Sequence, residues 1–169
     1  IWEPESCIQC GNCAYVCPHS VIRAKFYHKD NLKNVSDGFK HAPINARGFP
    51  ETMYTLQVYL EDCTGCNLCV EVCPATDPLN KNKKAINLGD KEPILEKEKT
   101  NIGIFENITW NDRSKIDFST VHGAQFLEPL FEFSGACAGC GETPYLKLLS
   151  QLFGSRLLVA NATGCSSIY

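Results

Sequence analysis

A run of four cysteines followed by a proline occurs twice in this chain and constrains its fold more than any other feature. The first copy spans residues 7–18, and the second spans residues 63–74. Both copies have the pattern C-x2-C-x2-C-x3-C-P, and each cysteine of the second lies 56 residues after its counterpart in the first. Chance does not produce one offset at all four cysteines, so we interpret the two runs as one motif used twice.

The chemistry that this spacing favours is ligation of two [4Fe–4S] clusters. In the bacterial ferredoxin spacing, the first three thiolates of a run hold one cluster and the fourth holds the other. Zinc sites usually take two separated C-x2-C pairs, and disulfides between cysteines three apart on a tight loop have poor geometry. The predicted ligand sets therefore cross over between the runs. They are Cys7, Cys10, Cys13 and Cys73 for one cluster, and Cys63, Cys66, Cys69 and Cys17 for the other.

Composition excludes several classes of function. The chain has 169 residues, which allows one or two domains. Its net charge of −3 is not the positive charge that nucleic-acid binding needs. No apolar run approaches the roughly 20 residues that span a bilayer, and no signal peptide is visible. Eleven cysteines imply a reducing compartment. Because the chain starts at Ile1 without a leader and stops at Tyr169 without a closing element, we expect a segment of a longer polypeptide.

The first part of the chain is predicted to be an α+β domain of the two-cluster bacterial ferredoxin type. Period-2 alternation and β-forming residues predict a strand at 53–60, and shorter strands are expected at 1–6, 21–24 and 85–88. A short helix is expected to carry the fourth cysteine of each run. Each fourth cysteine would then point into the other half and tie the two halves together.

Residues 26–51 are an insertion relative to a minimal two-cluster ferredoxin. Its expected turns are at Asp37-Gly38, Ala42-Pro43 and Phe49-Pro50, and we expect it to cover a cluster or to dock on another domain. Gly11 frees the backbone of the first cysteine loop, and Gly65 is expected to play the same part in the second.

Beyond residue 90 the composition changes. Lysine and glutamate interleave over 91–99, which is typical of a solvated helix face or a linker. The apolar residues that follow have mixed periodicity. We therefore expect an extended connector and a short helix around 123–131.

A glycine-rich stretch around Cys137 and Cys140 is the second informative feature. A helix is predicted over 144–153, ended by Gly154, with an apolar face of Leu146, Leu149, Leu152 and Phe153. A buried strand is predicted over 156–160, leading to a loop with Cys165. This loop–helix–strand order would open a doubly wound α/β domain. A lone C-x2-C leaves zinc, redox-dithiol and structural readings open, and the two upstream clusters favour a third cluster.

Together these residues resemble the pyruvate:ferredoxin (flavodoxin) oxidoreductases, a family of thiamine-diphosphate enzymes. The two cysteine runs and the strand before the second resemble the internal two-cluster ferredoxin domain of the family. Residues 135–145 and 160–169 resemble the opening of its thiamine-binding domain. The resemblance implies a ferredoxin-like domain at 1–90, a connector at 91–133, and a truncated thiamine-diphosphate-binding domain at 134–169.

The resemblance also implies roles for single residues. Cys137, Cys140 and Cys165 would bind a third cluster whose fourth ligand lies outside this stretch, and Glu142 and Cys165 would contact thiamine diphosphate. The full-length parent would also bind Mg2+, use pyruvate and coenzyme A, form a homodimer and pass electrons to ferredoxin or flavodoxin. No membrane or nucleic-acid partner is expected. It would work in the cytoplasm or in the matrix of an anaerobic mitochondrion-related organelle. No catalytic residue falls in this stretch, so we expect no turnover by it alone.

Two other functions remain open at this point. The chain could be a free-standing two-cluster electron carrier, or it could belong to a related 2-oxoacid oxidoreductase, including one fused to an NADP-linked reductase. Free ferredoxins are usually strongly acidic. Residues 1–90 carry ten acidic and nine basic side chains, and this near-neutral balance favours an internal relay.

Overall fold

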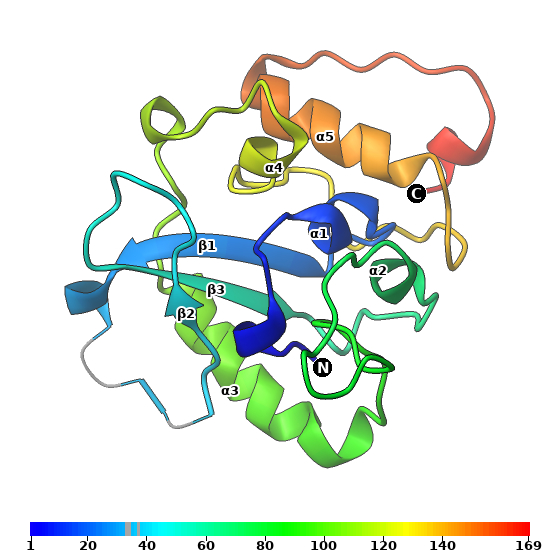
Figure 1. Ribbon diagram of the computed structural model, residues 1–169. Helices are drawn as coiled ribbons and strands as arrows, with labels where there is room; N and C mark the ends of the chain where they lie inside the picture. The colour runs from blue at the N-terminus through cyan, green and yellow to red at the C-terminus, as the bar shows by residue number, and fades with distance from the viewer. Residues whose placement is uncertain (33–34, 37) are drawn as a thin grey trace.

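A three-stranded antiparallel sheet lies at the centre of the molecule, in a computed structural model that describes residues 1–32, 35–36 and 38–169 (Figure 1). The strand order is β1-β3-β2, with bounds β1 Ile22–His28, β2 Ala42–Pro43 and β3 Thr52–Val58. β1 and β3 pair along their whole length, from Ile22 opposite Val58 to His28 opposite Thr52. The strand predicted at 53–60 is therefore confirmed, and the one predicted at 21–24 continues into the expected insertion.

Alternation along the strands gives the sheet two different faces. Ala24 and Tyr54 point into a core that also contains Cys17 and is flanked by five other cysteines of the two runs. Tyr27 lies on the opposite face, in a second core with Phe105. The first face therefore supports the cysteine loops.

Among the described residues, five α-helices lie around the sheet. They are α1 Asn12–Val16, α2 Leu68–Glu71, α3 Leu95–Glu106, α4 Val121–Ala124 and α5 Thr143–Phe153. α3 packs on β3 from below in Figure 1, whereas α1, α4 and α5 pack against one another on the other side. α1, which carries Cys13, thus lies between the sheet and α5.

The predicted strands at 1–6 and 85–88 are reduced to a single β-bridge between Trp2 and Ile86. Backbone hydrogen bonds flank the bridge, from Glu3 to Ala85 at 2.8 Å. The predicted strand cannot continue because Pro4 lacks an N–H to donate and starts a 3-10 helix, Pro4–Ser6.

The three turns expected in the insertion are only partly present in the structure. Asp37 lies outside the described residues, and Pro50 does lie in a turn. The turn expected at Ala42-Pro43 is wrong, because both residues form β2 against β3. Pro43 is tolerated there because β2 is an edge strand.

Between residues 91 and 133 the chain is more regular than expected. The charged stretch begins a 12-residue helix, α3, which agrees with the solvated helix face expected there and continues into the residues expected to form an extended connector. Lys25 contacts the end of this helix: its ammonium donates to the carbonyl of Phe105, which also accepts from the Ile108 amide, and to the carbonyl of Ile108 just beyond the helix. The helix expected around 123–131 is only Val121–Ala124, and the Thr120 hydroxyl accepts from the Gly123 amide at its start.

α5 has nearly the predicted bounds and ends at Gly154, whose φ is 57°. Its buried face is not the predicted one. Lys147, Ser150 and Gln151 are buried, whereas Leu149 and Phe153 are exposed.

The buried strand predicted over 156–160 is wrong. Gly154–Arg156 is a 3-10 helix, and Leu158 is 95% exposed. An apolar strand needs a neighbouring strand to pair with. In the described part of the chain, β1, β2 and β3 pair with one another, and none of them pairs with residues 156–160.

Candidate metal centre

The two cysteine loops have the same backbone conformation at equivalent positions. Gln9 and its counterpart Gly65 have φ of 59° and 67°, and Gly11 and its counterpart Asn67 have φ of 76° and 68°. Positive φ at two places lets each loop curl back on itself before the helix that follows it. Gly65 does adopt positive φ, as expected, but its counterpart in the repeat is Gln9, and the counterpart of Gly11 is Asn67.

The four cysteines predicted for the first cluster line one pocket. Cys7, Cys10, Cys13 and Cys73 surround it, and its other walls include Trp2, Tyr54, Leu56 and Ile86. Burial raises the pKa of the Cys7 and Cys13 thiols, and neighbouring cysteines raise both further. An apolar chamber with four thiols is a poor place for free thiolates and a suitable one for thiolates bound to iron.

The four cysteines predicted for the second cluster also gather together. Burial raises the pKa of Cys69 to about 11, and the next contributions come from Cys17, Cys63 and Cys66. Cys63 and Cys69 line a neighbouring pocket with Ile22 and Ile86. Cys17 is buried at the end of α1, so it reaches the second loop from the first half of the repeat.

A single ion and a cubane cluster place different demands on their ligands. Among residues 1–32, 35–36 and 38–169, no three His, Cys, Asp or Glu side chains converge closely enough to hold one metal ion. Zinc needs sulfurs at about 2.3 Å from one atom. In a cubane each cysteine binds a different iron, so the four sulfurs stand apart around the cluster.

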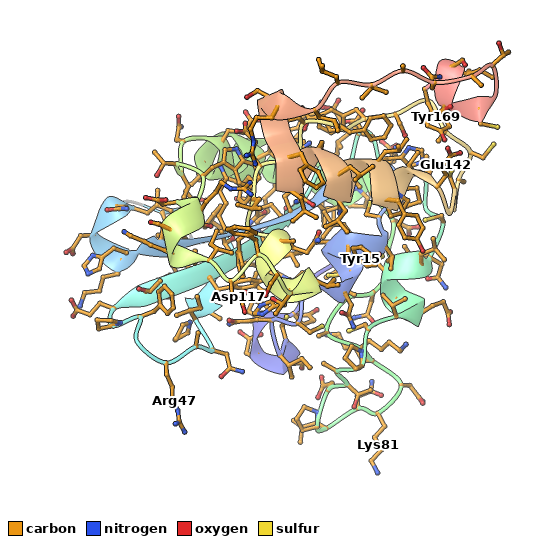
Figure 2. The ribbon with its side chains drawn as sticks, turned by 90° about the horizontal axis from the view of Figure 1, so that it is seen from above. Tyr15, Arg47, Lys81, Asp117, Glu142 and Tyr169 are labelled. Carbon is orange, nitrogen blue, oxygen red and sulfur yellow. The ribbon has the colours of Figure 1, made fainter. Side chains whose placement is uncertain are left out.

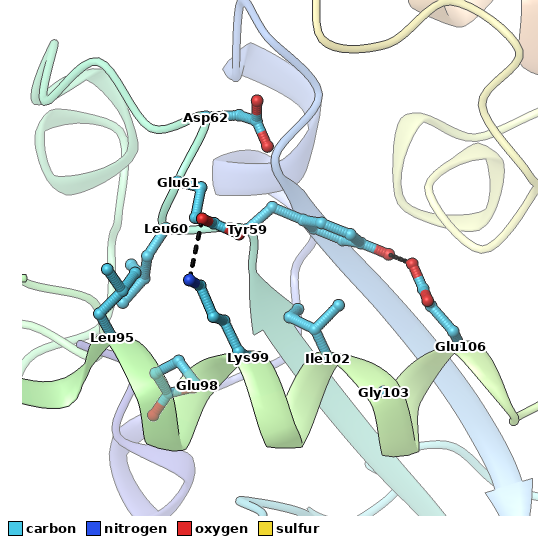
Figure 3. Close-up of a pocket in the computed structure, with 10 residues that line it drawn as sticks. All are labelled: Tyr59, Leu60, Glu61, Asp62, Leu95, Glu98, Lys99, Ile102, Gly103 and Glu106. Carbon is cyan, nitrogen blue, oxygen red and sulfur yellow. Dashed lines mark hydrogen bonds and ion pairs between the residues drawn. The ribbon is translucent and has the colours of Figure 1, made fainter.

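A separate groove lies between α3 and the segment that leads into the second cysteine run (Figure 3). Lys99 in this groove pairs with Glu61 at 3.0 Å, and the Tyr59 hydroxyl donates to Glu106 at 3.3 Å. None of its lining residues is a cysteine. These two contacts hold α3 against the segment that leads into the second cysteine run, and the groove is not itself a cluster site.

Cys137 and Cys140 lie on a loop next to the second cysteine run. A Cβ at Gly139, between them, would lie 3.9 Å from Cys66 Cβ. The backbone amides of Thr143 and Glu142, at the start of α5, lower the pKa of the Cys140 thiol. These hydrogen bonds favour the thiolate form of Cys140, and the loop that carries it lies close to the predicted second cluster.

Glu142 and Tyr169 meet at the same end of α5 (Figure 2). The Glu142 carboxylate raises the pKa of the Tyr169 hydroxyl, and Cys140 and Cys165 add to the effect. Cys137 and Cys165 are exposed. The predicted third set of cysteines thus borders the solvent rather than the core.

Two residues near the cysteines were missed by the sequence argument. Gln9 anchors the first loop: its Nε2 donates to the Pro43 carbonyl at 2.8 Å, and its Oε1 accepts from the Asn45 amide at 2.7 Å. Lys147 is buried against α1. A signal for Lys147 was available, because it is the only charged residue within α5.

Comparison with known proteins agrees with this geometry. Residues 6–76 match the family described as "4Fe-4S dicluster domain". The chain therefore contains a ferredoxin-like dicluster domain. Within the described residues, none of the helices combines the length and apolar character needed to cross a membrane.

The chain is also similar, over its whole length, to much longer proteins. It is 51% identical over 169 residues to a pyruvate-flavodoxin oxidoreductase of Trichormus variabilis and to a probable pyruvate-flavodoxin oxidoreductase of Escherichia coli. It is 43% identical over 170 residues to a pyruvate:ferredoxin oxidoreductase of Moorella thermoacetica. These alignments cover 99–100% of the chain and 14% of each relative. The resemblance expected from the sequence is confirmed, and it extends through all parts of the chain.

Proposed function

We propose that this chain is the electron-relay segment of a pyruvate:ferredoxin or pyruvate-flavodoxin oxidoreductase. The observation that carries the proposal is the similarity to such enzymes along every part of a chain whose eight repeated cysteines gather in two groups. The whole enzyme would convert pyruvate and coenzyme A to acetyl-CoA, CO2, one proton and two electrons. The segment would carry these electrons one at a time and would not react with pyruvate itself.

The relay would hold two complete [4Fe–4S] clusters. Cys7, Cys10, Cys13 and Cys73 would bind the first, in the pocket that these four side chains line. Cys63, Cys66, Cys69 and Cys17 would bind the second, supported by the mutual effects of these thiols. Each half of the repeat would thus supply one ligand to the cluster of the other half.

A third cluster would lie where electrons enter. Cys137, Cys140 and Cys165 would supply three ligands, and the fourth would come from another part of the parent. The approach of the Cys137–Cys140 loop to Cys66 supports this order. Electrons would pass from the third site to the cluster at Cys66 and then to the cluster at Cys7.

Residues 134–169 would begin the thiamine-binding domain, after the connector at 91–133 and the ferredoxin-like domain at 1–90. Glu142 and Cys165 would contact thiamine diphosphate, which the parent would hold with Mg2+. When bound, this cofactor stabilises a carbanion and so permits loss of CO2. The position of Glu142 beside Tyr169, Cys140 and Cys165 supports a shared boundary between cofactor and cluster.

The partners follow from the proposed reaction. Ferredoxin or flavodoxin would accept the electrons, and the full-length enzyme would be a homodimer. Thiolate-bound clusters require a reducing compartment. We place the protein in the cytoplasm or in the matrix of an anaerobic organelle.

The proposal is tested by adding pyruvate and coenzyme A, without oxygen, to the polypeptide that carries this chain. The visible absorption of the clusters should bleach and acetyl-CoA should form. With Cys140→Ser, bleaching should slow while CO2 release from pyruvate stays detectable, because the entry site is damaged and the thiamine chemistry is not. Clusters that pyruvate cannot reduce, but that an added reductase can, would favour a free-standing carrier. Faster reduction by another 2-oxoacid would favour a related enzyme.

A further inference from the structure

Lys147 lies in the middle of α5 and is only 2% exposed. On the same helix, Tyr145, Leu149 and Phe153 are 62%, 40% and 48% exposed. α5 therefore buries its lysine and leaves apolar side chains in contact with solvent. Lysine is almost never fully buried without a partner, so this arrangement needs a physical reason.

The ammonium of Lys147 is held by neutral acceptors. It donates to the carbonyls of Ala14 and Tyr15 in α1, the second at 3.3 Å, and to Gln125 Oε1 at 3.0 Å. The two carbonyls belong to the last turn of α1, which leaves its acceptors free. No ion pair among the described residues includes Lys147. Its charge is therefore buried without a carboxylate to neutralise it.

The location of this charge is specific. α1 begins just before Cys13 and ends just before Cys17, so Lys147 binds the backbone between the two cysteines. Burial lowers the pKa of Lys147 to about 8, while Cys17 and Cys13 favour its charged form. The positive charge of Arg23 also lowers the pKa of Lys147, but the Arg23 guanidinium is itself paired with Glu132. Lys147 is thus the unneutralised cation beside one ligand of each predicted cluster.

We propose that Lys147 is a positioning residue whose buried charge, set between Cys13 and Cys17, raises the reduction potentials of both clusters. This inference rests on the proposed function, because it requires both clusters. Reduction adds one negative charge to a cluster, and a cation in a poorly solvated setting stabilises that charge. α5 begins directly after the Cys137–Cys140 loop. The helix next to the proposed entry site would therefore also tune the two clusters that receive the electrons.

The test compares Lys147→Gln with wild type in the polypeptide that carries this chain. Gln can still donate hydrogen bonds but has no charge. Potentials are measured at pH 7 by anaerobic redox titration followed by EPR. We expect the equilibrium constant for reduction of each cluster to fall at least tenfold, which is about 59 mV for a one-electron couple. Lys147→Arg keeps the charge, so both reduction potentials should stay close to their wild-type values.

Lys25→Gln is the matched control. Lys25 is equally buried at 2% exposure and also donates to two backbone carbonyls. The charged groups that act on it are Arg23, Glu106 and Glu128, and none is a cysteine. Its loss should destabilise the fold while leaving both potentials unchanged.

Three outcomes would overturn the inference. The first is a Lys147→Gln protein with wild-type iron content and unchanged potentials. The second is a Lys147→Gln protein that loses its clusters, which would show a purely structural role, and the third is an equal shift of the potentials in Lys25→Gln. Failure of the proposed function would look different, because the wild-type protein itself would then lack two [4Fe–4S] spectra, or would show them but not be reduced by pyruvate and coenzyme A.

Discussion

At the scale of single residues, four positions in the cysteine loops need left-handed backbone, yet only two of them are glycine. Asn67 occupies one such position, and asparagine tolerates this conformation well. Gln9 occupies another and is held by the insertion through Pro43 and Asn45. The offset of 56 residues pairs Gln9 with Gly65 and Gly11 with Asn67, but a search for glycines alone does not reveal that Gln9 and Asn67 also adopt positive φ. The insertion also acquires a role, since it supports an unfavourable residue of the first loop.

Cys17 allows the crossed ligand sets to be tested directly. It is buried at the end of α1, and it raises the pKa of Cys69 more than the other thiols do. We expect Cys17→Ala to lose or alter the cluster that Cys69→Ala also affects. The cluster affected by Cys13→Ala should keep its wild-type EPR signal. Iron content and EPR spectra of the three variants provide the comparison.

Cys165→Ala serves as the control for Cys17→Ala, because Cys165 is exposed and distant in sequence from both runs. It should leave both ferredoxin-type clusters in place. If Cys17→Ala instead produced the spectrum of Cys13→Ala, each run would bind its own cluster and the crossed sets would be wrong.

At the scale of elements, α5 shows why an apolar pattern did not predict the buried face. The leucines of this helix suggested a core-facing stripe. The surface that α5 meets, however, presents backbone carbonyls: Gln151 donates to Leu127 at 2.9 Å, and Lys147 donates to α1. Free carbonyls of a neighbouring segment require donors. Such a requirement is not visible in the sequence of the helix itself.

α4 offers a stability prediction for the same interface. A Cβ at Gly123 would overlap the carbonyl oxygen of Asp117. We expect Gly123→Ala to destabilise the folded protein by about 1–3 kcal/mol through overpacking. The melting temperature should fall by several degrees and can be measured without oxygen by circular dichroism.

Gly103→Ala is the matched substitution in α3. Apart from the nearby backbone of α3 itself, no heavy atom of the described residues lies within 4 Å of the added methyl group, and alanine favours the helix by about 1 kcal/mol over glycine. This variant should melt at a slightly higher temperature than wild type. A Gly123→Ala protein as stable as Gly103→Ala would show that α4 adapts freely and does not hold α5 in place.

At the scale of the whole molecule, the parts that could be predicted are those determined by local patterns. The cysteine loops and β3 follow from spacing and from period-2 alternation, and the end of α5 follows from Gly154. The strand at 156–160 was wrong because an apolar run becomes a strand only where other strands receive it. A solvated helix face was one of the two readings of residues 91–99, but the continuation of α3 to Glu106 was not predicted, because its position depends on Phe105 and on the distant Lys25.

The three parts of the chain are therefore tied together more closely than their separate motifs indicated. α3 covers one face of the sheet, and α5 contacts α1 between two predicted ligand cysteines. We infer that the proposed relay is one folded unit, in which the segment next to the entry site contacts the segment that carries the electrons.

The central claim is that the two cysteine runs hold two [4Fe–4S] clusters close enough to exchange electrons. The most direct measurement is iron and sulfide analysis of the anaerobically prepared chain, combined with EPR of the reduced protein. We expect about eight iron and eight sulfide atoms per chain, from two cubanes, and a spectrum broadened by magnetic coupling between two reduced clusters. Zinc in place of iron, or a single uncoupled cluster signal, would contradict the account.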